Sequence, residues 1–368
     1  MFTPTAALPD CLLGLAVGDA MGVPMENLSP RRIARLFPNL DRPRFVFDYG
    51  MGSDDTEHAC MTAASLPIHD HTDSSTQAFR SSLAWRLRWW LLSGPAGIGH
   101  ATLKACVKLW LGFPSTKSGV WSAGNGPAMR SPVLGVAARS DAELADLVRA
   151  STRVTHTDPK AEYGALAVAV LARLAAKSRG TVPPTPDEFL AALDPFLPTD
   201  EPANELRSLL RQAAASFTEG KSVGEFATGL GLARGVTGYM YHTVPVAVFA
   251  FFRHADDYRA AVESTIRCGG DTDTVAAIAG AMVASRVGKD GIPAEWLNRY
   301  RDWPWSKRRI ERLGHTKAGL RDGLSCYVAD ARQAIVERLL DLVLPLPRNL
   351  FFFAVVMAHV VRRMLPPY

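Results

Sequence analysis

Apolar residues recur at helical spacing along most of this chain. After Thr274, for example, Val275, Ile278 and Met282 lie three or four positions apart, as on one face of a helix. The same pattern, in segments rich in Ala, Leu and Trp, predicts further helices at 12–19, after Asp54, and at 81–92, 162–176, 189–196, 204–215 and 258–266. No sustained alternation of β-branched residues supports a sheet. The pattern therefore predicts an all-α protein.

Segments rich in Gly and Pro separate these predicted helices at 29–49, 113–134 and 179–186. None has the length of a flexible linker, so we predict one large domain over residues 8–315. Residues 316–368 are predicted to form a helical appendage. Its apolar run, 350–361, is shorter than the roughly 20 apolar residues that span a bilayer. Docking on the core is the favoured interpretation, and membrane contact through the flanking arginines is the alternative.

Composition narrows the class of protein without defining it. The 368 residues are 48% hydrophobic and 21% charged, which fits a globular protein with a substantial core. The net charge of +5 is too small and dispersed to indicate nucleic-acid binding, although it would favour an anionic substrate. Five cysteines without CxxC spacing predict reduced thiols and a cytoplasmic location. The first residues lack a basic n-region, so no signal peptide is expected.

Two short acidic clusters are the most informative motifs. SDDTE occupies residues 53–57 and GGDTDT occupies residues 269–274, and each precedes a helix-like run. Either cluster could simply cap its helix, because Asp54 and Glu57 have capping-box spacing and Asp271 or Asp273 could serve as an N-cap. A cap needs only one carboxylate, however, and each cluster supplies two together with hydroxyl groups. This surplus favours a role in binding.

If the fold brings the clusters together, four carboxylates meet at one site and repel one another strongly. Hard divalent cations with oxygen ligands would neutralise them. The candidate ligands are Ser53, Asp54, Asp55, Asp271, Asp273 and Thr274. This all-oxygen set suits Mg²⁺ or Mn²⁺ and does not suit a structural zinc site. A pair of such ions could activate a water and stabilise a leaving atom.

Three further segments carry weaker indications. GDAMGVPMEN places Asp19 and Glu26 near a helix end, where a glycine stop with a solvated glutamate would look the same. The turn AGNGPAMR at 123–130 could cradle a diphosphate on backbone N–H groups, or be an ordinary Asn-Gly turn. THTDP places His156 beside a turn, where a histidine is more often structural.

Five segments in this order, GDAMGVPME, GSDDTE, GNGPAMR, THTDP and GGDTDT, resemble the ADP-ribosylglycohydrolase family. That family includes dinitrogenase reductase-activating glycohydrolases and ADP-ribosylarginine hydrolases. The resemblance spans residues 12–288 and implies a single orthogonal helical bundle with a dinuclear Mg²⁺ or Mn²⁺ site in a central cleft. It further implies hydrolysis of the bond that joins ADP-ribose to a protein side chain. An ADP-ribosylated protein would be the substrate, and a cognate transferase is a further candidate partner.

The resemblance also implies roles for individual residues. The six oxygen-bearing residues above would be the metal ligands, and Asp54, Asp55 and Glu26 the catalytic carboxylates. The implied substrate-binding residues are Gly124, Asn125, Gly126, Met129, His156 and Tyr239. For Tyr239, stacking on a base and packing in the core are both open interpretations.

One position departs from the family pattern. Many members have D-I-G-N-T-T where this chain has G-I-G-H-A-T, so Gly97 replaces the aspartate. The change puts arginine specificity in doubt and shifts proton transfer to Asp54, Asp55 or Glu26. Two alternatives therefore stay open. One is hydrolysis of another conjugate, such as O-acetyl-ADP-ribose or an ADP-ribosylated nucleotide or nucleic acid. The other is a protein that binds ADP-ribose or neutralises a transferase.

Overall fold

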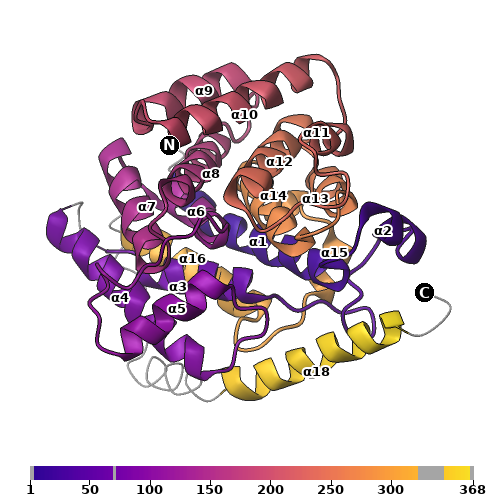
Figure 1. Cartoon of the computed structure of the whole chain (residues 1–368), viewed down its shortest axis with the longest axis horizontal. Coiled ribbons are helices and arrows are strands. Elements are labelled where there is room, and N and C mark those ends of the chain that lie inside the picture. Colours follow the sequence, from indigo (N-terminus) through magenta and orange to yellow (C-terminus); the bar gives the residue numbers. More distant parts are fainter. Residues whose placement is uncertain (1–3, 69–71, 322–343, 365–368) are drawn as a thin grey trace.

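The computed structural model describes residues 4–68, 72–321 and 344–364, and these residues form helices without any β-strand (Figure 1). This confirms the all-α prediction. The α-helices are α1 Leu8–Gly22, α2 Pro30–Leu36, α3 Asp54–Ser65, α4 Asp73–Leu92, α5 His100–Trp110, α6 Gly126–Ala137, α7 Asp141–Thr155, α8 Pro159–Lys177, α9 Pro186–Leu193, α10 Glu201–Thr218, α11 Val223–Gly229, α12 Met240–Arg253, α13 Tyr258–Arg267, α14 Thr272–Val287, α15 Ala294–Arg299, α16 Lys307–Arg321 and α18 Pro345–Met364. Short 3₁₀ turns are η1 Pro4–Ala7, η2 Val23–Met25, η3 Asp194–Phe196 and η4 Lys289–Gly291.

Two of the segments predicted as connections contain helices, and there the prediction was wrong. Helix α2 lies inside 29–49, and α6 begins inside 113–134. Pro30 and Pro127 stand in the first turns of these helices, where proline costs no hydrogen bond because the first N–H groups have no intrahelical acceptor. The predicted domain boundary at 315/316 falls within α16, and the division into two parts stays a prediction.

Helices α1 and α14 lie side by side at the centre of the molecule (Figure 1). The window Leu8–Met25 has a mean hydropathy of 1.2, enough by length and composition for a membrane span, but 94% of it is buried inside the protein. A helix that is apolar all round in this way belongs to a core. Gly14 and Gly18 of α1 face α14, and a Cβ at Gly18 would lie 2.3 Å from the Ala276 carbonyl oxygen. The two backbones are therefore in direct contact.

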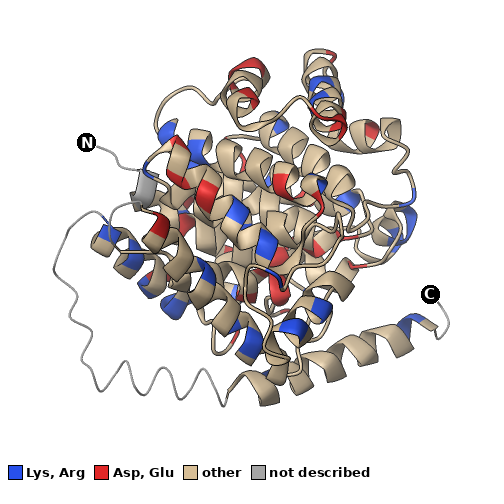
Figure 2. Cartoon of the chain, turned by 60° about the vertical axis from the view of Figure 1, so that its left-hand side comes forward, with Lys and Arg blue, Asp and Glu red and all other residues tan. Residues whose placement is uncertain are grey.

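Helix α18 follows the outer edge of the bundle and differs from the central helices (Figures 1 and 2). Figure 2 shows it largely without charged residues until its basic C-terminal end. Its buried residues are Arg348, Asn349 and Phe352. The Phe352 ring lies 4.6 Å from that of Phe45, centroid to centroid, in a small apolar cluster with Val23. Most of its other apolar side chains are exposed.

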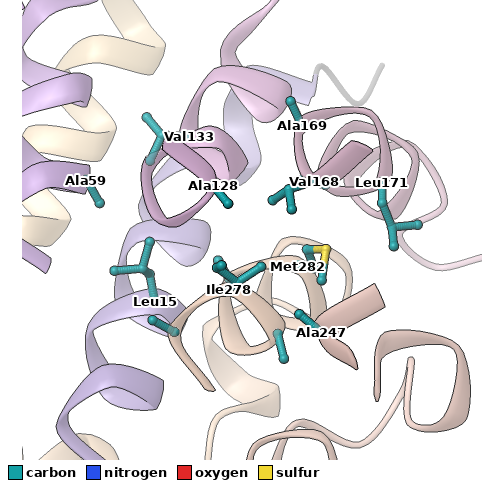
Figure 3. Packing of buried hydrophobic residues seen from close by; sticks show 14 of the residues in the cluster. Leu15, Ala59, Ala128, Val133, Val168, Ala169, Leu171, Ala247, Ile278 and Met282 are labelled. Carbon is teal, nitrogen blue, oxygen red and sulfur yellow. The ribbon is translucent and has the colours of Figure 1, made fainter. Parts of the chain in front are cut away.

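The core around α1 and α14 is built from small and branched side chains of the neighbouring helices. Figure 3 shows Leu15 and Ile278, from α1 and α14, close to Ala128 of α6, Val168 of α8 and Ala247 of α12. All five are essentially inaccessible to solvent. Close packing of this kind fixes the relative positions of helix ends, because a displacement would open voids.

Irregular segments cross one another beside the N-terminal ends of α3, α6 and α14. Gly270 makes isolated bridges to both Leu28 and Val236, while Gly124 pairs with Tyr239. Gly270 has φ of +80°, and a Cβ there would lie 1.9 Å from the Val236 carbonyl oxygen. Only glycine fits this crossing.

Candidate active site

The structure brings the two acidic clusters together across the ends of α3 and α14. The Thr274 hydroxyl donates a hydrogen bond of 3.0 Å to Oδ2 of Asp55, and the Ser53 hydroxyl donates one of 3.1 Å to the same oxygen. Residues 219 positions apart in the sequence thus share one acceptor. The juxtaposition comes from the packing of α1, α3 and α14 against one another.

Helix capping does not account for the acidic residues. Ser53 is the N-cap of α3 and accepts a hydrogen bond from the Asp55 amide. Asp271 occupies the N-cap position of α14, but its side chain makes no capping hydrogen bond. The Glu57 carboxylate accepts a hydrogen bond of 2.7 Å from the Trp90 indole instead of closing a capping box. Capping therefore does not explain the surplus of carboxylates in the two clusters.

A further carboxylate, Asp19, joins the clusters from α1. Asp19 is fully buried, and its Oδ2 accepts hydrogen bonds from the Ser53 amide at 2.7 Å and from both the amide and the hydroxyl of Thr56. This residue anchors the start of α3. Sequence reasoning noticed Asp19 in the GDAMG segment but did not place it among the metal ligands. Its burial against α3 depends on contacts that the sequence pattern does not show.

Asp19, Asp55 and Asp273 form a compact carboxylate triad. One oxygen from each lies within 4.8 Å of the others. Oδ1 of each is buried and has no hydrogen-bond partner in the described part of the chain. An unpaired buried carboxylate oxygen is costly, and it costs more where three carboxylates lie this close together. Together with the hydroxyls of Ser53 and Thr274, this donor set fits a hard divalent cation such as Mg²⁺ or Mn²⁺.

Protonation of the triad reflects the same electrostatic problem. Burial, reinforced by the charges of neighbouring carboxylates, raises the pKa of Asp55 and Asp273 well above the usual range. Burial also raises the pKa of Asp19 to about 6, against the effect of its hydrogen bonds from Thr56 and Ser53. Without a cation the site holds protons near neutral pH, and a bound cation would displace them.

A cleft of about 720 Å³ opens beside the triad, a volume typical of small-molecule sites. It joins regions that are far apart in the sequence. The residues with predicted roles that line it are Glu26, Ser53, Asp54, Gly124, Asn125, Gly126, Met129, His156, Asp271, Asp273 and Thr274. Asp55 lies beneath this surface and is 1% exposed.

The Gly-rich turn at 124–126 is tied directly to the second acidic cluster. The Asn125 side-chain amide donates a hydrogen bond of 2.6 Å to Oδ2 of Asp271 and one of 2.9 Å to the Thr243 hydroxyl. Gly126 begins α6, so the N-terminal end of a 12-residue helix meets the cleft here. Helix N-termini attract anions through free N–H groups and the helix dipole.

His156 lies beneath this turn. A Cβ at Gly124 would lie 3.1 Å from Nε2 of His156, and one at Gly126 would lie 3.2 Å from Cε1. Burial, with the charge of Arg130 in addition, lowers the pKa of His156 to about 3. The imidazole is therefore neutral, and its Nδ1 lies 2.8 Å from the Thr155 hydroxyl. The histidine both lines the cleft and supports the turn.

Tyr239 occupies the N-cap position of α12 and is half-buried. Its hydroxyl accepts a hydrogen bond of 2.9 Å from Lys160. Among the described residues, its neighbours Thr237 and Gly238 line the cleft and Tyr239 does not. Base stacking by this side chain stays a prediction.

Glu26 directly follows η2 and lines the cleft. Its Oε1 accepts a hydrogen bond of 3.1 Å from the side-chain amide of Asn27. Burial raises the pKa of Glu26 to about 7, with a further contribution from Asp271. This carboxylate can therefore hold or release a proton near neutral pH.

Gly97 passes close to the first acidic cluster. A Cβ at this position would lie 3.7 Å from Oδ1 of Asp54, and the residue has φ of +82°. Side chains are disfavoured at that φ. The chain therefore leaves open space next to Asp54.

Comparison with known proteins agrees with this fold. The model of the ADP-ribosylglycohydrolase family matches residues 7–323, and the chain belongs to that family. An uncharacterized protein of Archaeoglobus fulgidus is 30% identical over 80% of this chain and 91% of its own length. The ADP-ribosyl-[dinitrogen reductase] glycohydrolase of Rhodospirillum rubrum is 25% identical over 78% of this chain and 87% of its own length.

More distant relatives extend the same result. ADP-ribosylhydrolase ARH3 of Bos taurus is 23% identical over 78% of this chain and 86% of its own length. A solved structure described as an ADP-ribosylglycohydrolase-related protein complex superposes with a TM-score of 0.62 at 26% identity, and covers 86% of this chain and 99% of its own. The predicted family and fold are thus confirmed. The chain is a glycohydrolase that acts on ADP-ribosylated substrates and releases ADP-ribose.

Proposed function

We propose that this glycohydrolase is metal-dependent and removes ADP-ribose from a modified protein side chain. The observation that carries the proposal is the buried triad of Asp19, Asp55 and Asp273. One oxygen of each lies within 4.8 Å of the others, and Oδ1 of each has no hydrogen-bond partner among the described residues. No hydrogen bond within the described residues satisfies these oxygens, whereas a cation would.

Two Mg²⁺ or Mn²⁺ ions would be held by the carboxylate triad and the neighbouring oxygen donors. Those donors are Ser53, Asp54, Asp271 and Thr274. When bound, such ions neutralise the carboxylates, polarise substrate oxygens and lower the pKa of a water. The participation of Asp19 goes beyond the six ligands expected from the sequence.

Substrate binding is assigned to the turn at 124–126. Gly126 begins α6, and its end of the helix would hold the diphosphate of ADP-ribose. The hydrogen bond from Asn125 to Asp271 ties this turn to the acidic site. A diphosphate bound on the turn would therefore lie at a fixed distance from the acidic site. His156 supports the turn from below.

Proton transfer is assigned to Asp54 and Glu26, two of the carboxylates that line the cleft. Cleavage of a glycosidic bond develops positive charge on the ribose, which nearby carboxylates stabilise. One carboxylate takes a proton from the attacking water, and the departing side-chain atom receives a proton from the other. Gly97 contributes no acid, so Glu26 carries the leaving-group proton.

Asp273→Asn tests this proposal. We expect release of ADP-ribose to fall at least about a hundredfold, because loss of a cation removes several kcal/mol of transition-state stabilisation. ADP-ribose should be measured from arginine-, serine- and nucleotide-linked substrates in Mg²⁺, Mn²⁺ and EDTA. Activity should disappear in EDTA and be greatest on a protein-linked substrate.

Asp290→Asn is the matched control, because this exposed aspartate lies in η4, away from the cleft. It should keep normal activity, and circular dichroism should show that both variants are folded. Activity that persists in EDTA would exclude the metal-dependent mechanism. Preference for the nucleotide-linked substrate would replace the protein acceptor with a nucleotide.

A further inference from the structure

Helix α18 lies beyond residue 323, where the match to the family model ends, yet it forms part of the cleft. Phe352, Phe353 and Val356 line the cleft together with Ala96. Phe352 is buried, whereas Phe353 is 53% exposed. A segment outside the family's shared region therefore contacts the space in which substrate would bind.

The start of α18 is hydrogen-bonded to the segment that directly precedes the first acidic cluster. Arg348 is 2% exposed, and its Nε and Nη2 donate hydrogen bonds of 3.1 and 2.8 Å to the two carboxylate oxygens of Asp302. Arg348 also donates to the Gly52 carbonyl, and the Gly52 amide donates to Asp302. Gly52 directly precedes Ser53. A buried, two-pronged ion pair thus fixes the helix next to the acidic site.

The other end of α18 holds the segment that carries Glu26. Arg363 donates hydrogen bonds to the carbonyls of Pro24, at 2.5 Å, and Glu26, at 3.4 Å. His359 Nε2 lies 2.8 Å from the Phe45 carbonyl oxygen. The helix is therefore attached on both sides of its cleft-lining residues, and Phe353 and Val356 occupy a fixed position.

The contacts of α18 place it beside the first acidic cluster, because Arg348 bonds to the carbonyl of Gly52, the residue before Ser53. Its cleft-lining residues adjoin Ala96, and the next residue, Gly97, approaches Asp54. The turn at 124–126 is instead tied to Asp271. With the diphosphate on that turn and the scissile bond at the acidic site, the acceptor extends toward α18.

The surface that α18 presents to the cleft is apolar. Its lining side chains are phenylalanine and valine, and Arg348 and Arg363 are bonded to carboxylate or carbonyl oxygens. An arginine acceptor would lose the water around its guanidinium against this surface. Neither α18 nor position 97, which is a glycine, supplies a carboxylate to replace that water. An uncharged acceptor would bury carbon surface against Phe353.

We propose that α18 is the acceptor-recognition wall of the active site and that Phe353 directs the enzyme toward uncharged side-chain acceptors rather than arginine. This inference rests on the proposed function, since it assumes cleavage of an ADP-ribose–side-chain bond. Phe353 is a specificity-determining residue that contacts the leaving group and takes no part in metal binding or proton transfer.

The test compares Phe353→Ala and Phe353→Asp with wild type on one peptide modified either on serine or on arginine. Phe353→Ala should lower kcat/KM for the serine-linked peptide about tenfold, whereas Phe353→Asp should shift the serine-to-arginine ratio at least tenfold toward arginine. Calorimetric affinity for free ADP-ribose, which lacks an acceptor, should change less than twofold. Phe351→Ala is the matched control: Phe351 packs on Trp303 and does not line the cleft, so it should behave as wild type.

The outcomes separate the two proposals. A wild-type enzyme that releases ADP-ribose only in the presence of metal, but with a serine-to-arginine ratio unchanged by either Phe353 variant, overturns the inference alone. A loss of ADP-ribose affinity equal to the loss in kcat/KM also overturns it, because Phe353 would then contact the ADP-ribose part. A wild type that releases no ADP-ribose from any conjugate overturns both.

Discussion

At the scale of single residues, burial and hydrogen bonding determine which polar groups are available to react or bind and which hold the structure together. Asp19 and Asp273 are both buried acids with one unpaired oxygen, but Asp19 also holds the start of α3 through its second oxygen. His156 is a buried base kept neutral beneath the turn at 124–126. The sequence identified His156 and Asp273 through motifs. It could not show the environment that sets their protonation.

Replacement of His156 should change how stability depends on pH. The folded pKa of about 3 lies below the unfolded value of 6.5, so the unfolded state binds the proton first and stability falls as pH drops below 6.5. Between pH 7.5 and 5.5 the wild type should lose about 1.4 kcal/mol more than His156→Gln. Denaturant unfolding in EDTA measures this difference. Equal losses would show that the imidazole is protonated in the folded protein.

At the scale of elements, the close contact of α1 with α14 sets the geometry of the carboxylate triad. Asp19 belongs to α1 and Asp273 to α14, and the glycines of α1 let the two backbones touch. The sequence showed both helices through their apolar pattern. It did not show that they are neighbours, since α1 and α14 are separated by about 250 residues.

Gly18→Ala should therefore disturb both stability and metal binding. Its Cβ would lie 2.3 Å from the Ala276 carbonyl oxygen, and forcing the helices apart should cost about 1–3 kcal/mol. The displacement also separates Asp19 from Asp273 and should weaken Mg²⁺ binding. Gly224→Ala in α11 is the control, because no atom lies within 4 Å of its Cβ. Denaturant unfolding and Mg²⁺ titration check both effects, and unchanged Mg²⁺ affinity in Gly18→Ala would refute the coupling.

At the scale of the whole molecule, the acidic site links folding to cation binding. Helices α1, α3 and α14 each contribute one triad carboxylate, so the site exists only when all three are packed together. In the metal-free protein the raised pKa values mean that the folded state binds protons on these carboxylates more tightly than the unfolded state does. Protonation of the triad therefore stabilises the folded protein at low pH. That contribution is lost as pH rises through the folded pKa, about 6 for Asp19.

Mg²⁺ should raise the melting temperature of the wild type, and the rise should be larger at pH 7.5 than at pH 5.5. At the higher pH the cation has fewer protons to displace, and it binds only the folded state. At a hundred times its Kd the stabilisation is about 2.7 kcal/mol. Thermal unfolding with Mg²⁺ or EDTA measures it. Asp273→Asn should abolish the rise, and Asp290→Asn should retain it; a rise that is independent of pH would rule out proton displacement.

The sequence by itself determined the helical class, the family and the motif residues of the site, because helical periodicity and short motifs are local properties of the chain. Tertiary structure decided the rest. It added Asp19 to the acidic site through the packing of α1 against α3. It also joined α18 to the cleft through Arg348 and Asp302, 46 positions apart, a pairing that no local pattern marks. Burial and long-range contact set pKa values and cleft walls, and both exist only in the folded chain.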